Sequence, residues 1–246
     1  SQYNGNTQRF VNMLYENNII IVKGRNGTND VRGYQIAASP YIINPIFRNN
    51  TVKYETQNSV MRGACVVTQG ETTAGYNHDL ETPGHLINCT FITNDRFIRW
   101  GDPYENGGHQ NFWNCTFTKS GSAGTYRAMQ FGYAENTCES YENRLIDSVT
   151  GVGVDLTNGY CDGHTGKRNY ALGHSLYVLM RGTGAAILAN TSISVVDNSG
   201  VTQTIQTDAG GIARLDILEH FYQALPTEGA MTHTVRSGHL IRVAGY

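Results

Sequence analysis

The sequence predicts an all-β protein in which a short stack of parallel-strand coils is followed by a small β-sandwich. The motif Asn-Cys-Thr-Phe occurs at residues 88–91 and again at 114–117, while residues 187–246 hold short alternating strands separated by turns. The 246 residues include 28 Gly, 23 Asn, 25 Thr and 15 Tyr but only four Lys, a composition typical of turn-rich β proteins.

Two alternating motifs predict the coils. The asparagine motif has a third copy at residues 49–52 and a degenerate copy at 17–20. Between these copies lies a second strand pattern, which begins at Arg32, Arg62, Arg96 and Arg127. The chain therefore reads as strand, loop, strand, loop about four times, with a fifth pair expected at 144–149 and 153–156. Such repetition is the signature of a solenoid.

Stacking gives the motif residues separate roles. Parallel coils lie about 4.8 Å apart, so equivalent side chains lie above one another. Threonine should point outward and phenylalanine inward, since a strand alternates. We expect Cys65 on the second strand of its coil, away from the other cysteine column. The expected structural ladder consists of buried asparagines that exchange amide hydrogen bonds, with small thiols stacked inside: Asn49, Asn88, Asn114, Cys89 and Cys115.

These coils resemble right-handed parallel β-helix proteins of the pectate-lyase-like kind, over residues 10–160. The resemblance implies a β-helix over residues 1–186, which we expect to continue N-terminally in a longer protein. It also implies polysaccharide chemistry as one possibility, because many members of the family are lyases or glycoside hydrolases.

Residues 187–246 form the predicted sandwich. Strands are expected at 192–196, 202–207, 212–217, 232–235 and 239–243. The Asp-containing turns 197–200 and 208–211 separate the first three of them. Residues 216–223 fit either a strand, which we favour, or a short helix. The order of strands and turns resembles an immunoglobulin-like accessory domain of the carboxypeptidase-regulatory type.

Charge and cysteine content exclude several classes. The net charge of −2 and the charged fraction of 15% argue against a nucleic-acid partner, which needs a basic face. No apolar run approaches the roughly 18 residues of a membrane span. Five cysteines without a Cys-x-x-Cys pair predict neither a disulfide framework nor a zinc site. We therefore expect no cofactor and no metal.

One segment holds the candidate catalytic residues. A glycoside hydrolase needs two carboxyl groups about 5 to 9 Å apart. The candidates are Asp95, Arg99, Asp102, Glu105 and His109. Asp95 would be a general acid, Asp102 a base or nucleophile, and Arg99 a ligand of an acidic sugar. The alternative is a solvated loop beside the second strand. The polygalacturonase branch of the family has a paired Asp-Asp, which this chain lacks, and the Asp cluster of the lyase branch is not visible.

Aromatic side chains in or beside predicted loops are candidates for binding. They are Tyr76, Trp100, Tyr104 and Tyr126. Exposed rings provide large contact areas and could bind sugars or a neighbouring subunit. The alternative is that these rings pack over the ends of the coils.

The leading interpretation is a non-catalytic protein of an extracellular, cell-surface or virion location, used in adhesion or structural assembly. The alternative is a carbohydrate-active β-helix enzyme or phage tailspike that binds or cleaves a surface polysaccharide. The expected partners are a homo-oligomer or filament neighbour and a cell-surface glycan. Residues 1–10 offer no helical lid for the first coil, so we expect further coils or another subunit there. We expect residues 170–184 and the sandwich to cover the other end.

Overall fold

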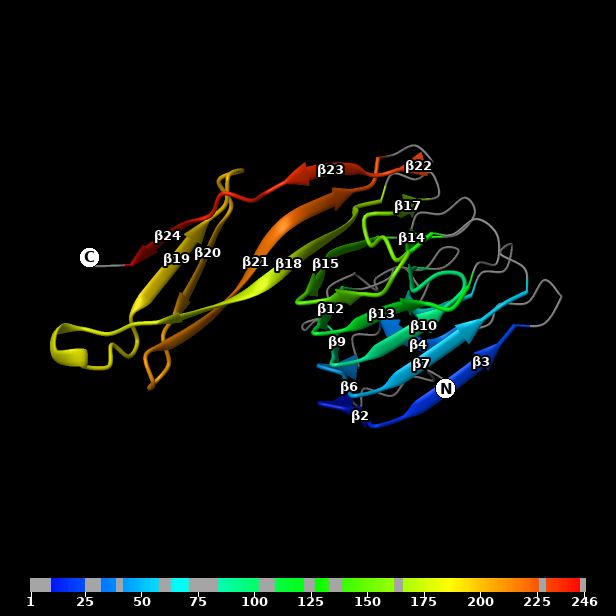
Figure 1. The fold of residues 1–246 in the computed structure, drawn as a ribbon, viewed down its shortest axis with the longest axis horizontal. Helices are drawn as coiled ribbons and strands as arrows, with labels where there is room; N and C mark the ends of the chain where they lie inside the picture. Colours follow the sequence, from blue (N-terminus) through cyan, green and yellow to red (C-terminus); the bar gives the residue numbers. More distant parts are fainter. Residues whose placement is uncertain are drawn as a thin grey trace. The chain divides into compact units, whose positions relative to one another are not determined.

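The chain forms two compact units, both built from β-strands (Figure 1). The computed structural model describes residues 10–24, 32–38, 42–57, 63–70, 84–101, 109–121, 127–132, 139–161, 166–225 and 229–243. The first unit comprises Ser1–Tyr170 with Tyr222–Thr232, and the second comprises Ala171–Phe221 with His233–Tyr246. The division falls inside the long strands β18 (Arg168–Leu179) and β21 (Ile212–Gln223), whereas the sequence suggested a boundary after residue 186.

Among the described residues, the first unit contains five successive coils of three strands each. The strands are β2 (Leu14–Glu16), β3 (Ile19–Lys23) and β4 (Arg32–Ala38); β6 (Ile46–Arg48), β7 (Thr51–Glu55) and β8 (Ala64–Gly70); β9 (Gly84–Ile87), β10 (Thr90–Thr93) and β11 (Ile98–Trp100); β12 (Gln110–Trp113), β13 (Thr116–Lys119) and β14 (Met129–Phe131); β15 (Ser140–Ile146), β16 (Val149–Thr150) and β17 (Gly159–Cys161). Two further short strands, β1 (Phe10–Val11) and β5 (Ile42–Ile43), pair in parallel. The motifs predict two strands in each coil; the structure adds a third, which ends directly before the asparagine.

Equivalent strands of successive coils form parallel sheets, which establishes a short parallel β-helix. One sheet has the order β16-β13-β10-β7-β3, and the second has the order β17-β14-β11-β8-β4 for its parallel strands. The third begins β2-β6-β9-β12-β15 and continues with β18 and β21. The register aligns the motif as predicted, since Phe91 lies opposite Val52 on one side and Phe117 on the other.

The motif alternates between core and surface. Val52, Phe91 and Phe117 are fully buried, and the rings of Phe91 and Phe117 stack with centroids 5.3 Å apart. Thr90 and Thr116, one residue earlier, are only half-buried. The predicted alternation of outward threonine and inward phenylalanine is therefore confirmed.

The asparagine of each motif occupies a left-handed turn between two strands. Asn49, Asn88 and Asn114 have φ values of 55°, 54° and 52°. Asn17 and Asp147 take the equivalent places in the first and fifth coils, with φ values of 59° and 54°. Asn and Asp adopt this conformation more readily than other residues that carry a side chain. The backbone of the turn thus explains why the motif begins with asparagine.

These turn asparagines form a ladder on the surface. Asn114 Nδ2 donates to Asn88 Oδ1 at 2.9 Å, and Asn88 Nδ2 donates to Asn49 Oδ1 at 3.4 Å. Asn49 Nδ2 in turn donates to Glu16 Oε1 at 3.4 Å. The three amides are exposed, which corrects the expectation of a buried ladder.

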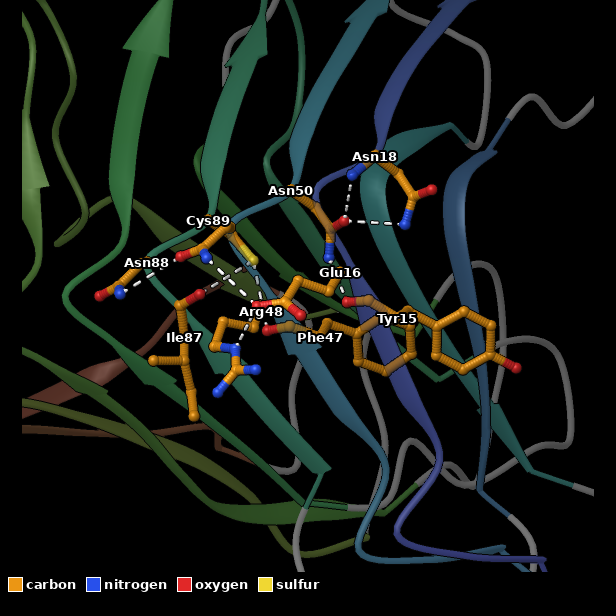
Figure 2. A network of polar contacts seen from close by, with 10 residues as sticks. Tyr15, Glu16, Asn18, Phe47, Arg48, Asn50, Ile87, Asn88 and Cys89 are labelled. Atoms are coloured by element: carbon orange, nitrogen blue, oxygen red, sulfur yellow. Dashed lines mark hydrogen bonds and ion pairs between the residues drawn. The ribbon is translucent and has the colours of Figure 1, made fainter.

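A second column, one residue later, is buried. Asn50 Oδ1 accepts hydrogen bonds from the backbone N–H and the side-chain amide of Asn18, at 2.8 and 3.0 Å (Figure 2). In the next coils this column contains thiols: Cys89 Sγ donates to Phe47 O at 3.4 Å, and Cys115 Sγ donates to Leu86 O at 3.3 Å. Both thiols are buried and free. Cys65 lies on β8, away from this column, as the motif alignment predicts.

Returning chain covers the C-terminal end of the coil stack. The ring of Tyr222 stacks on Tyr170 with centroids 4.8 Å apart, and Arg168 Nη2 donates to Leu225 O at 3.3 Å. Strand β22 (Gly229–Ala230) pairs antiparallel with β17. Residues 222–225 and 229–230 therefore contribute to this cover together with Tyr170, which belongs to the expected segment 170–184.

The second unit has two packed layers. Strands β19 (Ser192–Val196), β20 (Thr202–Gln206) and β24 (Leu240–Val243) form one antiparallel sheet in the order β20-β19-β24. Its core joins Ile193 and Val195 of β19 to Ala213 and Leu215 of β21. This arrangement matches the predicted small sandwich, and residues 216–223 are strand, as favoured. The 3₁₀ turn Thr183–Ala185 is the only helical element in the described part of the chain, and no helix there is suited to cross a membrane.

The surface ladder yields a stability prediction. Asn88→Ala should lower the free energy of unfolding by about 1–2 kcal/mol, because it removes two exposed amide hydrogen bonds and places alanine in a left-handed turn. Asn88→Gly is the matched control, since it loses the same bonds but tolerates the turn, and should lose less stability. Chemical denaturation measures both variants. Equal losses would show that the turn conformation is not what asparagine provides.

Candidate functional site

Several predicted site residues lie outside the described part of the chain. They are Asp102 and Glu105 among the catalytic candidates, and Tyr76, Tyr104 and Tyr126 among the aromatic ones. Asp95 is therefore the carboxyl group of the predicted catalytic set whose surroundings the structure describes.

Asp95 lies in the turn between β10 and β11, with only 1% of its surface exposed. Its Oδ2 pairs with Arg96 Nη1 at 3.0 Å, whereas its Oδ1 is buried with no hydrogen-bond partner among the described residues. Burial raises the pKa of Asp95 to about 6, against the opposing effects of the Arg96 and Arg127 cations. The structure thus contradicts the solvated-loop alternative at this residue, and a burial this deep leaves little room for contact with a polysaccharide.

Arg99 and Trp100 are also buried. Both are 0% exposed and belong to β11, where Arg99 lies in register between Val67 and Gln130. The indole of Trp100 stacks on Phe131 with ring centroids 4.6 Å apart. Trp100 is thus a core residue and not part of a binding surface, which corrects the expectation.

A different surface emerges around His109, on the outer side of the sheet that contains β9, β12 and β15. Leu86, Phe112 and Leu145 align across these strands and are buried in the core. Their neighbours along each strand therefore point outward. The rings of His85 and Trp113 stack there with centroids 4.7 Å apart and planes 22° apart.

Asn111 lies in register between His85 on β9 and Arg144 on β15. It is 8% exposed, and its Oδ1 is buried without a hydrogen-bond partner among the described residues. His85 Nδ1 is also buried without a hydrogen-bond partner among the described residues. Burial, assisted by the nearby His109, lowers the pKa of His85, so its imidazole is neutral at neutral pH and retains a lone pair for an incoming donor.

We name this surface the β9–β12 platform: His85, His109, Asn111, Trp113 and Arg144. Apart from Asn111, its members are half-buried and thus partly open to solvent. An aromatic ring can stack on the apolar face of a sugar, an amide can bind hydroxyl groups, and a guanidinium can bind a carboxylate. None of the five members is a carboxyl group, so the platform suits binding better than two-carboxylate hydrolysis.

Sequence reasoning found His109 but missed the other four members. The available signal was the alternation in residues 109–113, directly before the asparagine motif, where polar or aromatic residues flank the apolar Phe112. The segment 84–87 shows the same pattern around Leu86. In the described ranges no group of three or more His, Cys, Asp or Glu side chains converges as a metal site.

The raised pKa of Asp95 predicts a pH-dependent stability. An acid whose pKa rises on folding stabilises the protein fully below its unfolded value near 3.8, and this contribution is lost as pH rises through about 6. The wild type should therefore gain about 2 kcal/mol relative to Asp95→Asn between pH 7.5 and pH 4. Urea denaturation across this range measures the gain. Glu142→Gln removes an exposed carboxyl group of the same unit and is the control, which should leave the pH dependence of the free energy of unfolding unchanged. If the free energies of unfolding of wild type and Asp95→Asn differed by the same amount at every pH, the assignment would be wrong.

No protein-family model, curated protein or solved structure matches the chain. The likeness to parallel β-helix proteins therefore rests on the repeated motif and on the register of the three sheets.

Proposed function

We propose that this chain is a non-catalytic protein of an extracellular, cell-surface or virion location, which adheres to a surface glycan and takes part in structural assembly. The observation that carries the proposal is the β9–β12 platform. There, a partly open aromatic stack lies beside a guanidinium and a buried amide oxygen that has no hydrogen-bond partner among the described residues.

The platform combines the groups that carbohydrate recognition uses. Trp113 supplies an aromatic face, and Arg144 supplies a cation suited to acidic sugars. Asn111 supplies a carbonyl oxygen that can accept a hydrogen bond. The three side chains come from neighbouring strands whose register is held by backbone hydrogen bonds. A surface ordered before binding loses little conformational freedom when a ligand arrives.

We infer that the first unit is of the pectate-lyase-like kind and the second of the immunoglobulin-like, carboxypeptidase-regulatory-like kind. Parallel sheets joined by asparagine turns support the first assignment, and two layers with short Asp turns support the second. A shared fold hosts both enzymes and binding proteins. The alternative of a polysaccharide hydrolase or lyase needs an accessible acid, and Asp95 is buried against Arg96.

The first coil supports the assembly role. Leu14, Ile19 and Ile21 are 50%, 75% and 62% exposed. Ile19 and Ile21 lie on β3, the outermost of the described strands in its sheet, in register with the polar Thr51 and Lys53 of the next coil. Outermost strands with apolar side chains are templates for pairing with other chains. We propose that a homo-oligomer or filament neighbour contacts this edge.

Loss of the aromatic stack tests the adhesion role. Trp113→Ala should weaken binding to immobilised acidic polysaccharides at least tenfold, because it removes the ring on which a sugar would stack, and Asn111→Ala should do the same. Thr116→Ala changes a half-buried residue of the neighbouring sheet and is the matched control. Affinity electrophoresis in gels containing polygalacturonate, alginate or dextran measures the effect and separates acidic from neutral ligands.

Two outcomes would reject the adhesion proposal. Binding that survives both platform variants would remove the platform as the site. Release of reducing ends or unsaturated products that depends on Asp95 or Asp102 would establish the enzyme instead.

Assembly through the first coil is tested by mass photometry at several concentrations. The wild type should form oligomers, and Ile19→Ser with Ile21→Ser should shift it to monomers, because the apolar edge is lost. Val149→Ser is the matched control, since Val149 is 56% exposed and continues the Ile19 column at the far end of the same sheet. A wild type that stays monomeric throughout would overturn the assembly role.

A further inference from the structure

Two histidines of the second unit face each other on neighbouring strands. His220 lies on β21 and His233 on β23 (Thr232–Val235). His220 Nδ1 and His233 Nε2 are 3.1 Å apart, and the ring centroids are 5.2 Å apart. His220 is half-buried and His233 is exposed, so solvent and small ions reach the pair.

The contact places two imidazole nitrogens at the separation that a chelated metal ion requires. In the hydrogen bond, one nitrogen carries the proton and the other offers its lone pair. With metal–nitrogen bonds of about 2.0–2.1 Å, nitrogens this far apart subtend about 100° at a shared ion. That angle lies between the octahedral and tetrahedral values, so the ion could replace the shared proton without a shift of the strands.

The charged groups nearby on β21 and β23 do not oppose a cation at this position. The Arg236 guanidinium lies 4.2 Å over the ring of Phe221, and Glu219 pairs with His174 at 3.5 Å. Glu219 and Phe221 flank His220 in the strand, so their side chains point to the opposite face.

We propose that His220 Nδ1 and His233 Nε2 form a two-histidine site for a divalent transition-metal ion of the zinc, nickel or copper class. On binding, both facing nitrogens donate lone pairs to the ion, and the proton between them moves through solvent to the far nitrogen of the ring that carried it, so each neutral ring keeps one N–H. In the described part of the chain, no third His, Cys, Asp or Glu converges on the pair, so the two imidazoles are the ligands that the proposal names. Imidazole ligands select these metals over the hard ions magnesium and calcium.

The sequence analysis did not consider this pair, whose separation of 13 residues is unlike that of known ligand motifs. Only the pairing of β21 with β23 brings them together. The proposal is independent of the adhesion role, since it concerns the second unit alone.

Isothermal titration of the whole chain with Zn²⁺ tests the site. The wild type should bind one ion at this pair. His220→Gln and His233→Gln should each weaken that binding at least tenfold, and the double variant should lose no more than either single variant, because each histidine is needed for the chelate. His174→Gln, an exposed histidine of the same unit, is the matched control and should bind like the wild type. Equal binding by wild type and double variant, or equal binding of Mg²⁺, would overturn the proposal.

A spectroscopic measurement on the wild type tests the site even if the variants fail to fold. The Cu²⁺ electron paramagnetic resonance spectrum of the wild type should show coupling to two imidazole nitrogens, and this signal should be absent when Zn²⁺ is added first in excess. Thermal unfolding without metal should give similar midpoints for wild type and variants, since the pair is at the surface. A copper spectrum without imidazole coupling would reject the site even if every variant failed to fold.

Discussion

The left-handed asparagine turn is the constraint on which the first unit depends. At this turn the chain leaves one strand and enters the next, and equivalent turns repeat at Asn17, Asn49, Asn88 and Asn114. A change of one residue in strand register exchanges the inner and outer faces, so the position of the turn decides which side chains enter the core. The amide ladder links the same turns from coil to coil, which aligns the strands on both sides of them.

The β9–β12 platform follows from that alignment. Trp113 directly precedes Asn114, and the alternation of its strand places Phe112 in the core and Trp113 outside. His85 belongs to the preceding coil, yet the register brings its ring onto Trp113. A solenoid thus builds a surface from residues about one coil apart in sequence, at spacings set by backbone hydrogen bonds. The histidine pair of the second unit arises in the same way, from the pairing of two strands.

Much of the fold could be predicted because its information is local. The motif predicts the stacked coils, the outward Thr90, the inward Phe91 and the separate place of Cys65. The third strand of each coil was missed because its residues share no motif; strands containing Leu86, Phe112 and Leu145 are alike only in carrying an apolar residue at the centre. The alternation of inward and outward side chains did not predict that Arg99 and Trp100 are both buried, because both sides of β11 are covered.

The all-β class, the coil register and the two-layer second unit follow from the sequence alone, since these depend on periodicity and turn chemistry within short segments. Which polar side chains are buried, and which of them meet, depends on the tertiary structure. Asp95, Arg99 and Trp100 are buried in the folded chain. His85 contacts Trp113, and His220 contacts His233. The physical reason is that burial and contact depend on neighbours one or more strands away, whose distance along the chain varies with loops that the motif does not constrain.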